Sequence, residues 1–239
     1  YSGAVVLENV KIDAAVAAVL NSNYGEKTIT IKDSKLSILG TWTRNNTIKT
    51  TYVFEGANTV GTLSASEYAK YVLAAEGATL TAPEGATVTT DAENCKVVYE
   101  DGAYKAVDAH VAQIGETKYM TLADAIAAAQ GGETITLLAD ITEDVTVNKS
   151  LTIDGAGKYY TGNISVEGST VAVTVKNVKF VNGTGYAVTT NRIKSITVEN
   201  CTVTDSAVMG FNVNEDANGD KIGGLVGYMN SGAGALTGN

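Results

Sequence analysis

The chain has 239 residues, 44% of them hydrophobic, which is enough apolar material for one large core or two modest ones. Its net charge of −9 and its pI of about 4.6 exclude nucleic acid and anionic membrane surfaces as expected partners, because both require clustered Lys and Arg. No run of sequence approaches the roughly 20 apolar residues of a membrane-spanning helix, so no membrane insertion is expected.

A six-residue pattern occurs four times: apolar, charged, Asn or Asp, small or apolar, polar, apolar. The copies begin at Leu7, Ile31, Val175 and Val198. The first two copies start 24 residues apart and the last two start 23 apart. Short Val, Ile and Thr runs at this interval indicate a solenoid of stacked β-rungs. The third residues of the copies, expected at a corner where a polar side chain bonds the bend or the next rung, are Asn9, Asp33, Asn177 and Asn200.

Residues 1–60 are expected to form the end of one solenoid segment, with strands at 28–32 and 50–54. Residues 61–108 are interpreted as a small α+β connector. Within it, Ser64 and Glu67 make a capping box that predicts a helix over 65–76, and Asp101-Gly102 predicts the turn of a hairpin over 96–105.

Residues 109–239 are expected to form a capped β-helix. A strand pair over 111–119 precedes an N-capped helix over 121–129, whose apolar stripe suits it to cover the end of the solenoid. The rungs that follow contain short pairs of apolar residues expected to face inward. These pairs are Ile135/Leu137, Val145/Val147, Leu151/Ile153, Ile164/Val166, Val173/Val175 and Ile196/Val198.

Residues 111–129, followed by 140–142 and 151–155, resemble the opening of pectin-lyase-like right-handed β-helix modules, which occur in large surface proteins of gut and other anaerobic bacteria. Residues 222–228 are similar to a Gly-Leu-rich repeat of bacterial adhesin-like proteins. The resemblance covers most of 109–239 and, more loosely, 1–40. It implies a mainly β, right-handed parallel β-helix in a secreted or cell-surface protein.

Enzymes of this fold include polysaccharide lyases and inverting glycosidases. Arg192-Ile193-Lys194 is similar to a substrate-binding tripeptide of polygalacturonase-type glycosidases, but the Asn-Thr-Asp, Asp-Asp and Gly-His-Gly elements of those enzymes are missing. We therefore assign no catalytic residue. The expected ligand contacts are Arg192 and Lys194, together with Tyr159 and Tyr160, whose rings would suit a sugar face.

Asn214, Asp216, Asn218 and Asp220 place oxygen ligands at alternating positions, with Gly219 at the sixth position of the run. This arrangement is similar to the first half of a calcium loop. The twelfth position is Leu225, where a bidentate Glu would be needed, so the match is partial. Calcium at these four residues is the one cofactor that the sequence suggests, and a polar loop without a cofactor is the alternative.

The two cysteines, Cys95 and Cys201, lack metal-ligand spacing. Cys201 stands where the repeat places Val178, so we expect a buried free thiol that packs as a small hydrophobe, with pairing to Cys95 as the alternative. The only histidine, His110, lies upstream of the principal rungs and is not expected to act as a base.

The leading functional hypothesis is a non-enzymatic extracellular module of a bacterial surface protein, a rigid stalk or adhesin-like β-helix. The chain begins and ends in rung-like sequence, which predicts either a piece cut from a longer protein or end-to-end self-association into a filament. Expected partners are therefore a second copy, head to tail, or host or bacterial glycans and proteins. The alternative is a carbohydrate-active enzyme, a lyase or glycoside hydrolase, acting in the groove of the β-helix.

Overall fold

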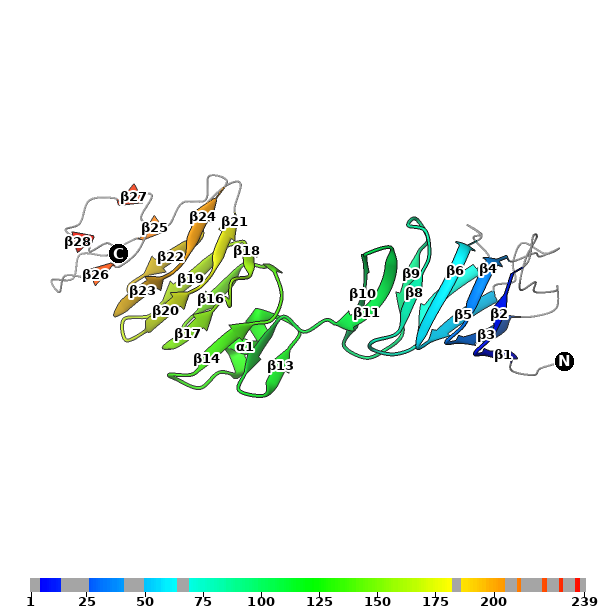
Figure 1. The fold of residues 1–239 in the computed structure, drawn as a ribbon. Coiled ribbons are helices and arrows are strands. Elements are labelled where there is room, and N and C mark those ends of the chain that lie inside the picture. The colour runs from blue at the N-terminus through cyan, green and yellow to red at the C-terminus, as the bar shows by residue number, and fades with distance from the viewer. Residues whose placement is uncertain are drawn as a thin grey trace. The chain divides into compact units, whose positions relative to one another are not determined.

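The computed structural model describes residues 5–13, 26–40, 50–63, 69–181 and 186–204, and beyond them the backbone of four two-residue strands (Figure 1). These residues form a parallel β-solenoid of about seven turns. The prediction of a mainly β solenoid with a short capping helix is confirmed. The chain divides into two compact units, unit 1 (Tyr1–Ala109) and unit 2 (His110–Asn239).

The described residues of unit 1 form two sheets, and the chain alternates between them. Its five-stranded parallel sheet contains β1 (Val5–Glu8), β3 (Lys27–Lys32), β5 (Thr50–Glu55), β7 (Ala69–Leu73) and β9 (Val88–Thr90). The parallel part of the other sheet contains β2 (Lys11–Ile12), β4 (Lys35–Leu39), β6 (Ala57–Leu63) and β8 (Thr79–Thr81). The odd-numbered strands β1 to β9 therefore form one sheet of the coil, and the even-numbered strands β2 to β8 form the other.

The core of unit 1 is made by side chains that repeat at the same position of successive rungs. Ile29, Tyr52 and Tyr71 pair in register along one column, and all three are buried. The rings of Tyr52 and Tyr71 stack with their centroids 5.7 Å apart. Because every second residue of a strand points inward, the period-two pattern of the sequence fixes which side chains enter this core.

An antiparallel hairpin ends unit 1. Strands β10 (Cys95–Glu100) and β11 (Ala103–Asp108) pair across the predicted turn, where Asp101 and Gly102 have φ of 53° and 76°, and β11 pairs antiparallel with β8. The hairpin is confirmed. The helix predicted over 65–76 is wrong for its described residues, because Ala69–Leu73 is strand β7, paired in register with β5; residues 64–68 lie outside the described part. Strands β7, β8 and β9 of the expected connector thus continue the two sheets.

Three sheets with parallel strands are built by the residues that the structure describes over 134–204 of unit 2. One contains β14 (Thr134–Leu137), β17 (Leu151–Asp154), β20 (Ala172–Lys176) and β23 (Ser195–Glu199). A second contains β15 (Ile141–Thr142), β18 (Tyr159–Thr161), β21 (Lys179–Val181) and β24 (Thr202–Thr204), and the third contains β16 (Val145–Val147), β19 (Ile164–Glu167) and β22 (Val188–Asn191). Two further pairs are β25 (Gly210–Phe211) with β27 (Tyr228–Met229), and β26 (Lys221–Ile222) with β28 (Ala235–Leu236).

All six apolar pairs predicted to face inward are buried in the core of unit 2. Ile135, Ile153, Val175 and Val198 lie on one another in register, each at most 5% exposed. Tyr160 and Phe180 meet edge to face with centroids 5.8 Å apart. Stacking residues of similar size keeps the rungs flat and the interior closely packed.

The first rung of unit 2 is covered by a hairpin and a helix. Strand β12 (Ala112–Ile114) pairs antiparallel with both β14 and β13 (Thr117–Tyr119). Helix α1 (Leu122–Ala128) begins at the N-cap Thr121, whose side chain accepts from the Asp124 N–H at 3.0 Å. The strand pair and the helix predicted for this region are confirmed. No helix of the described residues is long and apolar enough to cross a membrane.

Candidate functional site

The corners that the repeat predicted are present, and they are the most regular polar feature of unit 1. Asn9, Asp33 and Gly56 follow three strands paired in register and have φ of 54°, 46° and 66°. Asn, Asp and Gly tolerate this left-handed conformation better than other residues do, which explains why they recur at the bend. The backbone N–H groups of Asn9 and Asp33 donate to the carbonyls of Lys32 and Glu55 in the next rung, at 3.0 and 3.2 Å.

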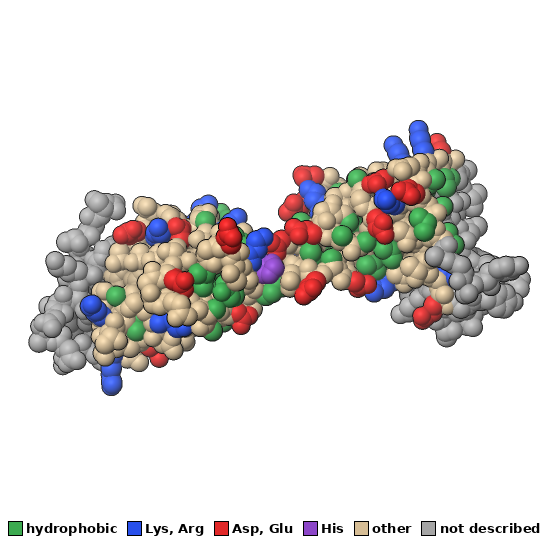
Figure 2. All heavy atoms as spheres, turned by 90° about the horizontal axis from the view of Figure 1, so that it is seen from below, with side chains coloured by type: hydrophobic (Ala, Val, Ile, Leu, Met, Phe, Trp, Pro, Cys, Tyr) green, Lys and Arg blue, Asp and Glu red, His purple; other side chains and the backbone are tan. Residues whose placement is uncertain are grey.

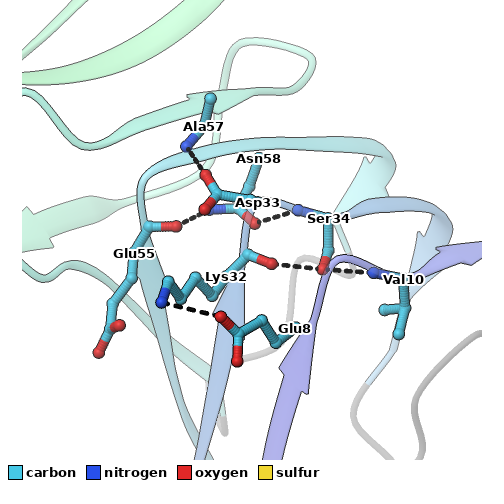
Figure 3. Close-up of polar contacts among 8 residues, drawn as sticks. All are labelled: Glu8, Val10, Lys32, Asp33, Ser34, Glu55, Ala57 and Asn58. Atoms are coloured by element: carbon cyan, nitrogen blue, oxygen red, sulfur yellow. Dashed lines mark hydrogen bonds and ion pairs between the residues drawn. The ribbon is translucent and has the colours of Figure 1, made fainter.

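Asp33 holds the following rung through its carboxylate (Figure 3). Its Oδ1 accepts from the Ala57 N–H at 2.9 Å. A Cβ added at Gly56 would overlap this same oxygen, so glycine is required there for close approach as well as for its φ. The corner is therefore built by a matched pair of residues 23 positions apart rather than by one turn motif alone.

Inside this corner runs a column of buried polar side chains (Figure 3). Ser34 Oγ accepts from the Val10 N–H at 3.2 Å and donates to the Lys32 carbonyl at 2.7 Å. Asn58 Oδ1 accepts from the Ser34 N–H at 3.0 Å, and Asn58 Nδ2 donates to the Glu55 carbonyl at 2.9 Å. Ser34 and Asn58 are 3% and 2% exposed. Among the described residues no buried side-chain nitrogen or oxygen lacks a partner.

Unit 2 has an equivalent corner. Asn177 and Asn200 have φ of 56° and 50°, and the Asn177 Nδ2 donates to Asp154 Oδ1 at 2.9 Å. Partial burial would raise the pKa of Asp154, but hydrogen bonds from Asn177, the Ala156 N–H and Lys176 outweigh it and lower that pKa. A general acid at neutral pH needs a raised pKa, so the lowered pKa of Asp154 suits a carboxylate that holds the corner rather than one that donates a proton.

Charged side chains alternate in sign along the outer face of both corners. Lys32 forms an ion pair with Glu8 at 2.9 Å and has Glu55 in register on its other side, and Lys176 pairs with Asp154 at 3.3 Å. Acidic and basic side chains are interspersed over each unit on the face that Figure 2 shows. The exposed pair of Lys32 with Glu8 is expected to contribute little to stability.

The four predicted ligand residues do not form one site. Tyr160 is fully buried in the core and its hydroxyl donates to the Glu143 carbonyl at 2.6 Å, so it has no free ring face for a sugar. Tyr159 is 49% exposed, with the Lys179 ammonium 5.1 Å from its ring centroid. Arg192 and Lys194 are exposed in the turn from β22 to β23, at the opposite end of the β17 sheet from the Tyr159 corner.

The predicted calcium ligands Asn214, Asp216, Asn218 and Asp220 lie outside the described residues. Within the described residues there is no group of three or more His, Cys, Asp or Glu side chains that could hold a metal ion.

Both cysteines are free thiols. Cys201 packs against the core as expected, but it is partly buried rather than buried, and its Sγ lies 3.3 Å from the Glu199 carbonyl. Burial raises its pKa, which makes the reactive thiolate form scarcer.

Carboxylates in the first rung of unit 2 are occupied by backbone amides. Asp140 Oδ1 accepts from the Tyr159 N–H at 2.9 Å and Asp144 Oδ1 from the Asn163 N–H at 2.7 Å. The two carboxylate oxygens of Glu143 accept from the Leu122 and Ala123 N–H groups at 3.0 and 3.3 Å. The sequence did not reveal these roles, because each joins residues about 20 positions apart.

Comparison of the chain with protein-family models, with curated proteins and with solved structures finds no match.

Proposed function

We propose that the chain is a non-enzymatic module of a secreted or cell-surface bacterial protein, serving as a rigid stalk or adhesion surface. The observation that carries this proposal is the use of polar and acidic side chains as ties between rungs. Asp33, Asp140 and Asp144 each accept a backbone N–H from the following rung. Carboxylates committed in this way hold the coil together and are not free to act as a catalytic pair.

The interior supports the same proposal. Side chain and backbone are tied across rungs in the column of Ser34 and Asn58, where an unpaired polar group would cost about 1–3 kcal/mol. A stack held by such bonds as well as by its β-ladders resists bending, which is what a spacer needs. Acidic and basic side chains are interspersed on the face that Figure 2 shows, which suits a protein in contact with water outside the cell.

A depolymerisation assay separates the stalk from the carbohydrate-active enzyme. The purified chain is incubated with pectin, alginate and host glycans, and reducing ends and unsaturated products are measured. We expect no release above that of the heat-denatured protein. Release that falls in an Arg192→Met/Lys194→Met variant, but not in the control Lys35→Met/Lys96→Met at exposed positions of unit 1, would contradict the proposal and favour an enzyme acting at the exposed turn.

Adhesion and self-association are tested separately. The first strand, β1, exposes Val5 and Val6 at 44% and 57%, and an exposed apolar strand edge is a pairing surface. We propose a second copy as the head-to-tail partner at this edge. Sedimentation at rising protein concentration should show association that Val6→Lys abolishes, since an edge lysine opposes pairing. Association unaffected by Val6→Lys would place it elsewhere, and a glycan-binding array tests the adhesin proposal independently.

A further inference from the structure

Helix α1 is held at both ends by charged side chains from one short stretch of the first rung. At its N-terminus the Glu143 carboxylate accepts from the Leu122 and Ala123 N–H groups. At its C-terminus the Lys149 ammonium donates to the Ala127 and Ala129 carbonyls, both at 3.0 Å. These are the backbone groups that a helix leaves without internal partners, and each charge has the sign that the helix dipole favours.

The anchors are themselves fixed by neighbouring rungs. The Glu143 N–H donates to the Thr161 carbonyl at 3.0 Å, and the Glu143 carbonyl accepts from the buried Tyr160 hydroxyl. Next to Lys149, the Ser150 carbonyl accepts from the Gly132 N–H at 2.8 Å, which ties down the chain that leaves the helix. The rungs therefore present both charges to the helix in a prearranged position.

The helix needs such anchors because its own sequence and its apolar contacts stabilise it only weakly. It has seven residues, four of them alanine, and an isolated helix of that length is not stable in water. Its last turn contains no basic residue. Its large buried side chains are Leu122 and Ile126, so its apolar contact with the rung is modest.

The cap covers the first rung of unit 2 in two parts. Strand β12 pairs with the edge of β14, and helix α1 packs against β16. The core residues of these two strands, Ile135 and Val145, are 0% and 5% exposed. The cap therefore hides apolar positions of the first rung.

We propose that Glu143 and Lys149 form an electrostatic clamp that keeps α1 closed over the first rung of unit 2, and that this clamp prevents the rung from pairing with another molecule. The clamp is a conformational device of this end of unit 2. It holds whether or not the chain is a surface stalk, since it depends only on the cap.

The test compares Glu143→Gln/Lys149→Met with the matched control Glu167→Gln/Lys194→Met, which makes the same charge changes at exposed positions of unit 2. Hydrogen exchange of the α1 amides should be about tenfold or more faster in the clamp variant, and sedimentation should show association that the control lacks. Exchange within the later strands β20 and β23 should stay unchanged.

A second measurement needs no variant. Raising the salt concentration screens the clamp, so exchange of α1 should quicken in the natural chain while that of β20 does not. Equal α1 exchange in the clamp variant and the control would overturn the proposal. Loss of protection spread evenly over α1, β20 and β23 would also overturn it, because the cap and the rungs would then open as one unit.

Discussion

Gly56→Ala is the substitution that tests the corner of unit 1 most directly. Gly56 has φ of 66°, a conformation that costs an L-residue about 1–2 kcal/mol. The new Cβ would also overlap Asp33 Oδ1, and moving that carboxylate away breaks its bond to the Ala57 N–H, which costs about 0.5–1.5 kcal/mol more. We expect the free energy of unfolding of unit 1 to fall by about 2–3 kcal/mol.

Gly77→Ala is the matched control, because Gly77 has φ of 81° and nothing within 4 Å of an added Cβ. Both substitutions carry the same kind of backbone penalty, so the difference between them isolates the overlap with Asp33. Urea unfolding is followed by hydrogen exchange of the amides of β5 and β7, which belong to unit 1. In a double-mutant cycle, Gly56→Ala should lower the free energy of unfolding by about 1 kcal/mol less in the Asp33→Ala background than in the natural chain. Equal costs for the two glycine variants, or strict additivity with Asp33→Ala, would refute this account of the corner.

Three further predictions concern stability. Asn58→Leu should destabilise unit 1 by about 1–3 kcal/mol, because it leaves the buried Ser34 N–H unpaired. Thr28→Leu, at an exposed position of the same unit, should cost little, and urea unfolding measures both. Lys32→Met should change stability by less than about 0.5 kcal/mol, because its ion pair with Glu8 is exposed, and a larger loss would mean that the outer charges carry the fold. Burial raises the pKa of Tyr71 to about 12, so the unfolded chain loses this proton first, and unit 1 should lose stability as the pH rises from about 10 to 12; Tyr71→Phe should flatten that dependence, and a variant as sensitive as the natural chain would contradict it.

The rungs were predictable because their signals are local. Alternation of apolar and polar residues marks which side chains of a strand face inward, as in Leu151 and Ile153, and Asn or Asp marks a left-handed bend. The third corner of unit 1 was not counted as a copy of the pattern, because Gly56 stands at the Asn or Asp position and Ala57 is inserted before Asn58, although the stacking continues.

The errors arose where tertiary contacts decide. Residues 69–73 contain good helix formers, but pairing with β5 and the stacking of Tyr71 on Tyr52 favour a strand, which overrides intrinsic propensity. Of the two adjacent tyrosines, only Tyr159 faces out, because neighbouring strand residues point to opposite sides. The partners of Glu143 and Lys149 lie about 20 residues away and carry no motif, so only the structure reveals them.

The repeated stacking of rungs means that the length of each unit depends on the number of circuits it contains. Val5 pairs with Ile29 and Leu151 with Val173, so these circuits contain 24 and 22 residues, whereas the circuit from Tyr52 to Tyr71 contains 19. Each circuit advances the coil by about 4.8 Å, and each rung contacts only the rungs above and below it. Duplicating one such segment within a unit would lengthen that unit by one strand spacing and would leave the existing contacts between rungs in place. Repeated duplication of the coding sequence would therefore lengthen the protein on the nanometre scale.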